Sequence, residues 1–239
     1  MRSIWIGFDP REIAAYAVCR NSIKRRVAKE VPVNPVILDD VQSKQFYWRK
    51  TKRQKSIVDK PILWDVISDA PMSTEFAISR FLTPHLAGEG WALFMDCDMM
   101  ARTDFGKIFE RADPKYAVMC VKHQYKPKHE IKMDGQAQTA YERKNWSSFM
   151  LFNCDHPSNK KLTLELINTV PGRDLHRFCW LEDDEIGELE AGWNWLVGEQ
   201  EQPSPLYNVH YTEGGPWFEG YEDVPLADEW RQELFAWAQ

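Results

Sequence analysis

The sequence predicts an α/β protein with a Rossmann-like, mostly parallel sheet flanked by helices. Three observations favour this class. An apolar run at residues 4–8 passes directly into helix-start signals, a second short apolar run follows at 36–38, and a five-residue apolar run at 91–95 ends in paired aspartates. The order strand, helix, strand is typical of parallel sheets, in which ligands bind beyond the carboxyl ends of the strands.

The first strand, residues 4–8, is expected to lead into a helix without a long loop. Asp9 suits the N-cap, Pro10 the first turn, and Glu12 the third position after the cap. Apolar residues then recur at helical spacing, at Ile13, Ala14, Ala17 and Val18. Residues 7–11 therefore lie at an edge where a parallel sheet binds ligands.

Later elements follow from the same signals. A helix is expected at 73–82, capped by Ser73 and ended by Pro84. Further strands are expected at 36–38, 91–95, 116–121, 149–153 and 208–211, and a second helix at 159–170. We interpret residues 1–239 as one domain, with 218–239 a C-terminal helical extension. The Trp-rich end, 230–239, suits an amphipathic helix for self-association or membrane contact.

Composition narrows the function classes. Thirty basic and 36 acidic residues give a net charge of -6, so no global positive field favours nucleic acid. The basic run at 49–55 is interpreted as a solvated loop, with a clamp for an anionic acceptor or a membrane surface as the alternative.

Cysteine usage and hydropathy bear on the compartment. Five widely spaced cysteines without a CxxC pair favour reduced thiols over a disulfide framework or a zinc site. The first residues become polar too soon for a signal peptide, and no apolar run approaches the roughly 20 residues of a membrane span. We therefore expect a cytoplasmic protein for which peripheral membrane contact and the oligomeric state stay open.

Asp96 and Asp98 are the central chemical feature. Residues i and i+2 of an extended chain project to the same side, so both carboxylates can meet one hard cation. A DxD pattern is expected about once by chance in a chain of this composition, so its position directly after the apolar run at 91–95 gives it specificity. A cation there would bind a diphosphate and neutralise the charge that develops on a nucleoside diphosphate leaving group.

A second feature lies far downstream, in the segment that begins at His210. An imidazole can complete a manganese coordination shell. Gly214 and Gly215 would let backbone approach a phosphate closely, and Trp217 would flank a sugar. A core histidine followed by a Gly-Pro turn is the alternative interpretation of this segment.

Together these features resemble the retaining glycosyltransferases of family 8, which have the GT-A fold. The resemblance implies that Asp96, Asp98 and His210 bind Mn²⁺ (or Mg²⁺) and a UDP-sugar. The family's early aspartate, which contacts the base, is similar to Asp9, with Gly7 and Phe8 as neighbours. A family arginine that reaches the donor sugar and phosphate is similar to Arg80.

Two weaker likenesses concern the reacting sugar. The family's Asn-Ser-Gly segment is similar to Trp146-Ser147-Ser148, which implies a donor contact by Ser147 and Ser148. Its Asp-Gln pair near the reacting carbon is similar to Asp183-Asp184. By that likeness Asp183 would steady the developing positive charge or act as a transient nucleophile.

One departure concerns the diphosphate. The segment from His210 to Pro216 is one residue shorter than the family motif, and Gly215 stands where the family has a lysine. Another cation must then balance the diphosphate. The candidates are Arg11, Lys122, Lys132, Arg143 and Lys144. Residues 132–136 and 143–146 are a hypothesis for the acceptor side.

The resemblance implies transfer of a sugar, with retention, from a nucleotide-sugar to a saccharide or other hydroxyl acceptor. In the favoured mechanism the acceptor attacks from the front face and the donor phosphate takes its proton. Two alternatives stay open. One is a metal-dependent nucleotidyl- or phosphotransferase, although the sequence has neither a P-loop nor a GxGxxG. The other is a catalytically inactive nucleotide-sugar-binding module, which the missing lysine favours.

Overall fold

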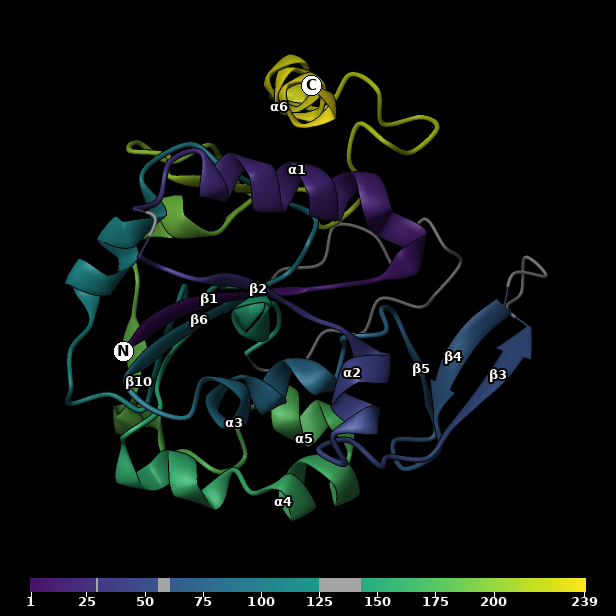
Figure 1. Ribbon diagram of the computed structural model, residues 1–239, viewed down its shortest axis with the longest axis vertical. Coiled ribbons are helices and arrows are strands. Elements are labelled where there is room, and N and C mark those ends of the chain that lie inside the picture. Colours follow the sequence, from purple (N-terminus) through teal and green to yellow (C-terminus); the bar gives the residue numbers. More distant parts are fainter. Residues whose placement is uncertain (29, 56–60, 125–142) are drawn as a thin grey trace.

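A six-stranded sheet forms the centre of the molecule (Figure 1). The computed structural model describes residues 1–28, 30–55, 61–124 and 143–239. The strand order is β10-β8-β9-β6-β1-β2, and β9 runs antiparallel to both of its neighbours while the other pairs are parallel. The strands span β1 Arg2–Gly7, β2 Val33–Val36, β6 Trp91–Met95, β8 Val118–Cys120, β9 Phe149–Asn153 and β10 Ile186–Glu188. The predicted mixed, mostly parallel sheet is confirmed.

Helices cover both faces of this sheet, with α1 on one side and α3, α4 and α5 on the other (Figure 1). These helices are α1 Ile13–Lys24, α3 Thr83–Ala87, α4 Leu164–Thr169 and α5 Gly172–His176. The central strands β6 and β9 are almost entirely apolar, because they are covered on both faces. Each large apolar side chain buried in this way stabilises the fold by about 1.5–3 kcal/mol.

The junction between β1 and α1 has the predicted form. The Asp9 side chain accepts a hydrogen bond from the Arg11 backbone N–H and caps the 3-10 helix Pro10–Glu12, which continues into α1. Further 3-10 helices connect the remaining elements, at Ser79–Leu82, Phe105–Arg111, Trp146–Ser148, Pro157–Lys161, Asp183–Glu185 and Ala191–Trp193.

Some element predictions were wrong. The strand expected at 36–38 ends at Val36, and Leu38 begins helix α2, Leu38–Ser43. Acidic residues in its first turn favour the helix start, and its buried residues Leu38 and Val41 have helical spacing. The helix expected at 159–170 is split, because a 3-10 helix ends at Lys161 and α4 starts at Leu164. The strand expected at 116–121 is shorter, because only Val118–Cys120 form strand β8.

The helix expected at 73–82 was also wrong. Residues 73–78 form turns and the 3-10 helix Ser79–Leu82 leads into α3. Pro84 lies in the first turn of α3 rather than ending a helix. Proline is tolerated there because the first-turn N–H groups have no partner within the helix.

A small second sheet has the order β11-β12-β7, with β7 Met99–Ala101, β11 Trp195–Leu196 and β12 Asn208–His210. Strand β12 is antiparallel to β7, and His210 pairs with Met99. This sheet therefore continues from the end of β6 and brings a late segment of the chain beside it.

A third, antiparallel sheet, β3-β4-β5, projects from the side of the molecule (Figure 1). It comprises β3 Thr51–Lys55, β4 Pro61–Asp65 and β5 Ala70–Met72, so part of the basic run at 49–55 is a strand. Arg49 forms a fully buried ion pair with Asp65 at 2.7 Å and donates to the Ile167 carbonyl of α4. Removing one partner of such a pair costs about 3–5 kcal/mol, so it anchors this sheet.

The C-terminal helix α6, Ala227–Ala238, lies on the outer side of α1 (Figure 1). Its Glu233 is buried and pairs with Arg25 and Arg26 beside the end of α1. Phe235 and Trp237 are exposed, while self-association and membrane contact stay predictions. None of the helices that the structure describes is long and apolar enough to cross a membrane. All five cysteines are unpaired.

Candidate active site

The three predicted metal ligands lie together. One ligand atom from each of Asp96, Asp98 and His210 lies within 4.8 Å of the other two. The local cause is the pairing of β12 with β7, because His210 opposite Met99 stands next to Asp98. The His210 Nε2 atom is 3.2 Å from an Asp98 carboxylate oxygen. Two carboxylates and one imidazole form a donor set that suits Mn²⁺ or Mg²⁺, so the residues present fit a divalent cation.

Asn194 orients the imidazole. Its Oδ1 accepts a hydrogen bond from the His210 Nδ1–H at 2.9 Å, and its Nδ2 donates to the Ser148 hydroxyl at 2.9 Å. An amide oxygen only accepts, so Nδ1 carries the proton and Nε2 is directed to Asp98. Hydrogen bonds of this kind fix the tautomer and ring orientation of metal-binding histidines.

His210 and Asp98 stabilise each other's charged form. Burial alone lowers the pKa of His210, but the charge and hydrogen bond of Asp98 outweigh it and leave that pKa above its ordinary value. Burial alone raises the pKa of Asp98, and His210 reverses the shift. A bound cation would take the place of the proton shared by these two groups.

Arg80 fixes the other carboxylate. Its Nη1 lies 2.8 Å from an Asp96 carboxylate oxygen and donates to the Ser147 carbonyl at 2.9 Å. The guanidinium lies 5.3 Å and 5.2 Å from the ring centres of Phe76 and Phe94. Held by these rings, the buried arginine pairs with Asp96 and keeps its carboxylate directed into the site.

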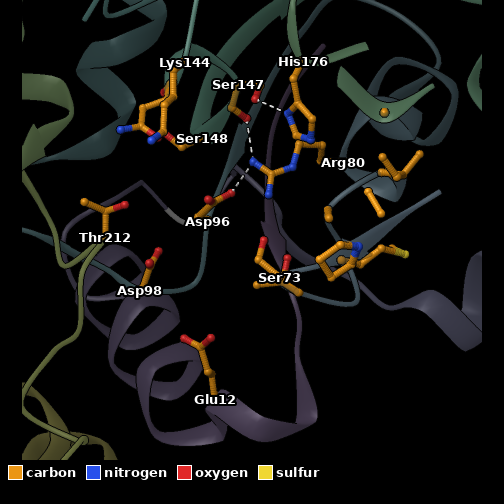
Figure 2. A pocket seen from close by; sticks show the side chains of 18 of the residues that line it. Glu12, Ser73, Arg80, Asp96, Asp98, Lys144, Ser147, Ser148, His176 and Thr212 are labelled. Carbon is orange, nitrogen blue, oxygen red and sulfur yellow. Dashed lines mark hydrogen bonds and ion pairs between the residues drawn. The ribbon is translucent and has the colours of Figure 1, made fainter. Parts of the chain in front are cut away.

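The cluster opens into a cavity of about 1270 Å³ (Figure 2), large enough for a drug-sized ligand. Nine of the predicted site residues line it: Arg11, Arg80, Asp96, Asp98, Ser147, Ser148, His210, Gly214 and Trp217. Six others do not line it, namely Gly7, Phe8, Asp9, Gly215, Asp183 and Asp184. Their expected roles stay predictions.

The residues near the end of β1 that lie outside the cavity have structural contacts. The fully buried Asp9 accepts two hydrogen bonds from the Arg11 side chain and one each from the backbone N–H groups of Arg11 and Glu75. A Cβ on Gly7 would lie 2.4 Å from the Phe76 ring, and Phe8 packs edge-on against Tyr16. Arg11, held by Asp9 and the Ser73 carbonyl, lines the cavity instead.

Close packing explains the glycines after His210. A Cβ on Gly215 would lie 1.9 Å from the Trp217 ring, so no side chain fits where the family 8 motif has a lysine. Gly214 has a φ of 150°, which disfavours other residues. Trp217 packs against Tyr211 and against Trp230 of α6. Its buried indole N–H has no hydrogen-bond partner in the described part of the chain.

The acidic pair Asp183-Asp184 is exposed, on the 3-10 helix before β10. Asp183 forms an ion pair with Arg143. Arg143, one of the candidate cations for the diphosphate, therefore pairs with an acidic residue outside the cavity. Of the other candidate cations, Arg11 and the buried Lys144 line the cavity, and Lys122 lies over the Trp146 ring. Lys132 and the rest of the expected acceptor segment 132–136 lie outside the described residues.

Sequence analysis missed three residues of the site. Asn194 had no signal beyond its place between two tryptophans, and Glu12 was interpreted only as a helix-start residue. His176 lines the cavity, and its Nδ1 is 2.6 Å from the Ser147 hydroxyl oxygen. Burial lowers the pKa of His176 to about 3, with Arg80 and Arg49 adding to the shift, so it stays neutral and fixes the Ser147 hydroxyl.

Glu12 is directed into the cavity toward Asp98 (Figure 2). Burial raises the pKa of its carboxyl group to about 8, and the charges of Asp98, Asp9 and Asp96 add to this shift. The Glu12 Oε2 atom lies 3.9 Å from the Cys97 sulfur. The site thus gathers a third acidic side chain beside the two of the DxD motif.

Comparisons with known proteins bear on the family and on the fold of this chain. No family model matches the chain. It is 45% identical to Protein CDI of Arabidopsis thaliana over 237 aligned residues. The alignment covers 97% of this chain and 85% of that protein. The chain belongs to the Protein CDI family.

Solved structures with a similar fold are glycosyltransferases. GlyE of Streptococcus pneumoniae TIGR4 matches with a TM-score of 0.61 and 17% identity, over 99% of this chain and 61% of GlyE. The galactosyltransferase LgtC, in complex with donor and acceptor sugar analogues, matches with a TM-score of 0.56 and 11% identity. The match covers 98% of this chain and 95% of LgtC. The bifunctional glycosyltransferase WbbM matches with a TM-score of 0.59 and 14% identity. The match covers 97% of this chain and 49% of WbbM. The chain thus spans about half of WbbM, and the likeness shows the GT-A fold.

Asn194→Ala is expected to lower the affinity for Mn²⁺ by about 10- to 100-fold, because the imidazole loses the group that fixes its tautomer. Calorimetric titration with Mn²⁺ measures the change. Asn168→Ala is the matched control, since Asn168 is also a buried amide but bonds to the Trp48 N–H and the Phe46 carbonyl. An equal loss of affinity in both variants would contradict the role of Asn194.

Glu12→Gln is expected to stabilise the metal-free protein in a pH-dependent way. The Glu12 pKa is about 8 in the fold against 4.5 for the free group, so the unfolded chain loses this proton first and stability falls as pH rises through that window. The variant lacks this loss, so its advantage in Tm should grow from about pH 5 to about pH 8.5 in thermal unfolding with a chelator. The exposed Glu110→Gln serves as control. A Tm difference independent of pH would refute the shift.

Proposed function

We propose that this chain is a retaining glycosyltransferase of the family 8 type. It moves a sugar from a nucleotide diphosphate sugar, with UDP as the nucleotide, onto a saccharide or other hydroxyl acceptor with the assistance of Mn²⁺. One observation carries the proposal: Asp96, Asp98 and His210 meet at the carboxyl end of β6, in a GT-A fold, on the wall of a large cavity. A metal-bound diphosphate belongs at this place in such a sheet.

In this proposal Asp96, Asp98 and His210 hold the cation. When bound, the cation supplies Lewis-acid stabilisation of the negative charge on the departing diphosphate. Arg80 keeps Asp96 in place, and Asn194 does the same for His210. The binding geometry is therefore set before the donor arrives, which is how a preorganised site lowers a barrier.

Two cations on the cavity wall take over from the lysine of the family motif. Lys144 precedes the 3-10 helix Trp146–Ser148, and Arg11 follows β1. Either can approach the diphosphate, whose charge one divalent cation leaves partly uncompensated. The inactive binding module was favoured by the missing lysine, and these two residues weaken that alternative.

Retention follows from a front-face mechanism. Asp183 and Asp184 do not line the cavity, so the proposed mechanism does not depend on them. The acceptor hydroxyl then gives its proton to the oxygen of the departing diphosphate. The protein positions the two substrates, with the Ser147 hydroxyl fixed by neutral His176 on the cavity wall.

The first test replaces metal ligands. Asp96→Asn and His210→Ala are each expected to lower Mn²⁺-dependent hydrolysis of a UDP-sugar by about 100-fold or more, because each removes part of the stabilisation of the leaving group. Release of nucleoside diphosphate is the measurement, and the exposed Asp113→Asn is the control. Full activity in either variant would remove that residue from the ligand set.

The same assay separates the alternatives for the wild-type protein. Mn²⁺-dependent binding of one nucleoside diphosphate, with no turnover of any of its sugars, would identify a binding module. Tight binding of a free nucleoside triphosphate with release of pyrophosphate would identify nucleotidyl transfer. Release of the diphosphate from a nucleotide-sugar supports the proposed function.

The second test concerns the diphosphate. Lys144→Met is expected to weaken UDP binding by about tenfold or more, the value of one charge-assisted hydrogen bond, while the affinity for Mn²⁺ alone is retained. Calorimetry with each ligand provides both values. Lys122→Met removes a nearby lysine that does not line the cavity, and equal losses of UDP affinity in the two variants would argue against a specific role for Lys144.

A further inference from the structure

Glu12 occupies a distinctive position in the cavity. It lies where β1 passes into α1, and its carboxylate is directed into the cavity from the side of Asp98 that faces α1 (Figure 2). Neither the metal cluster nor the diphosphate cations account for a carboxylate at this place.

Glu12 is not a member of the metal cluster. Among the described residues, the ligand atoms within 4.8 Å of one another belong to Asp96, Asp98 and His210, and Glu12 lies outside this group. With diphosphate oxygens added, three protein ligands suffice for a coordination shell. A carboxylate just beyond this shell is available to the part of the donor next to the diphosphate.

The neighbouring carboxylate, Asp9, differs because it is already hydrogen-bonded within the protein. It is fully buried, and its two oxygens accept four hydrogen bonds from Arg11 and Glu75. The Glu12 carboxyl group accepts from the Cys97 thiol at 3.9 Å, and a thiol is a weak donor. Glu12, unlike Asp9, can therefore accept hydrogen bonds from a ligand in the cavity.

The chemistry of a nucleotide defines what such a carboxylate would meet. The ribose is joined to the first phosphate through one methylene group, so its two hydroxyls lie near a metal-bound diphosphate but outside the metal shell. A carboxylate can accept from both hydroxyls of this diol, and acidic side chains of other nucleotide-binding α/β sheets bind ribose in the same way. A deoxyribose cannot make the full contact.

We propose that Glu12 recognises the ribose diol of the nucleotide and makes the site selective for ribonucleotides over 2′-deoxyribonucleotides. This inference rests on the proposed function, since it assumes that a nucleoside diphosphate binds at the metal cluster. It adds a specificity residue that contacts the sugar of the nucleotide and not the sugar that is transferred.

The test combines substitutions at Glu12 with changes in the ligand. Affinities for UDP and 2′-deoxy-UDP are measured by calorimetry at saturating Mn²⁺ for the wild type, Glu12→Ala and Glu12→Gln. The wild type should bind UDP about tenfold or more tighter than 2′-deoxy-UDP, the value of one hydrogen bond to a charged group. Glu12→Ala should lose this preference, and Glu12→Gln, which keeps one oxygen acceptor, should retain part of it.

Two controls isolate the contact. Glu213→Ala removes another carboxylate of the cavity wall and should keep the wild-type preference for UDP. Titration with Mn²⁺ alone should give the same affinity in the wild type and in both Glu12 variants. Unchanged metal affinity together with a lost ribose preference supports the proposal.

Three outcomes would overturn it. A loss of Mn²⁺ affinity in the Glu12 variants would make Glu12 a metal ligand. An equal change in affinity for UDP and 2′-deoxy-UDP would show an effect of charge without recognition of the diol. Absence of Mn²⁺-dependent binding of any nucleoside diphosphate by the wild type would overturn the proposed function, and the ribose contact with it, and the wild type alone reveals that failure.

Discussion

The antiparallel pairing of β12 with β7 is the constraint on which the site depends. It places His210 opposite Met99, so an imidazole from late in the chain reaches the aspartates after β6. A small apolar cluster, separate from the main core, stabilises this pairing. In it Val209 and Tyr211 pack with Trp230 of α6. The C-terminal helix therefore supports the geometry of the cluster although it contributes no ligand to it.

The site also brings three acidic side chains together in a partly buried place. Asp96, Asp98 and Glu12 share one partly buried space, and carboxylates in such a place are costly unless they are paired. Arg80 balances Asp96 and His210 balances Asp98, whereas burial and the nearby aspartates raise the pKa of Glu12 to about 8. A divalent cation would offset the repulsion among these carboxylates and would stabilise the arrangement.

The sequence predicted the parts of the molecule that local pattern determines. The apolar run before Asp96, the cap at Asp9 and the strand at 149–153 all have signals within a few residues. The prediction of a helix at 73–82 was wrong. The apolar residues there have a spacing that suits a helix, but they reach the core from turns and a 3-10 helix. Asn194 and Glu12 could not be assigned roles, since what each contacts is decided by the pairing of β12 and by the position of Asp98 in the fold.

The missing lysine shows how packing and charge are linked in this chain. The Trp217 ring fills the space that a side chain at residue 215 would need, and Trp217 in turn rests on Trp230 of α6. A lysine at that position would displace the ring and loosen the contact between the His210 segment and the C-terminal helix. The chain keeps the packed tryptophan there and presents Lys144 and Arg11 from other segments of the cavity wall. In the proposed function, the positive charge that a diphosphate requires has therefore moved within the site without being lost.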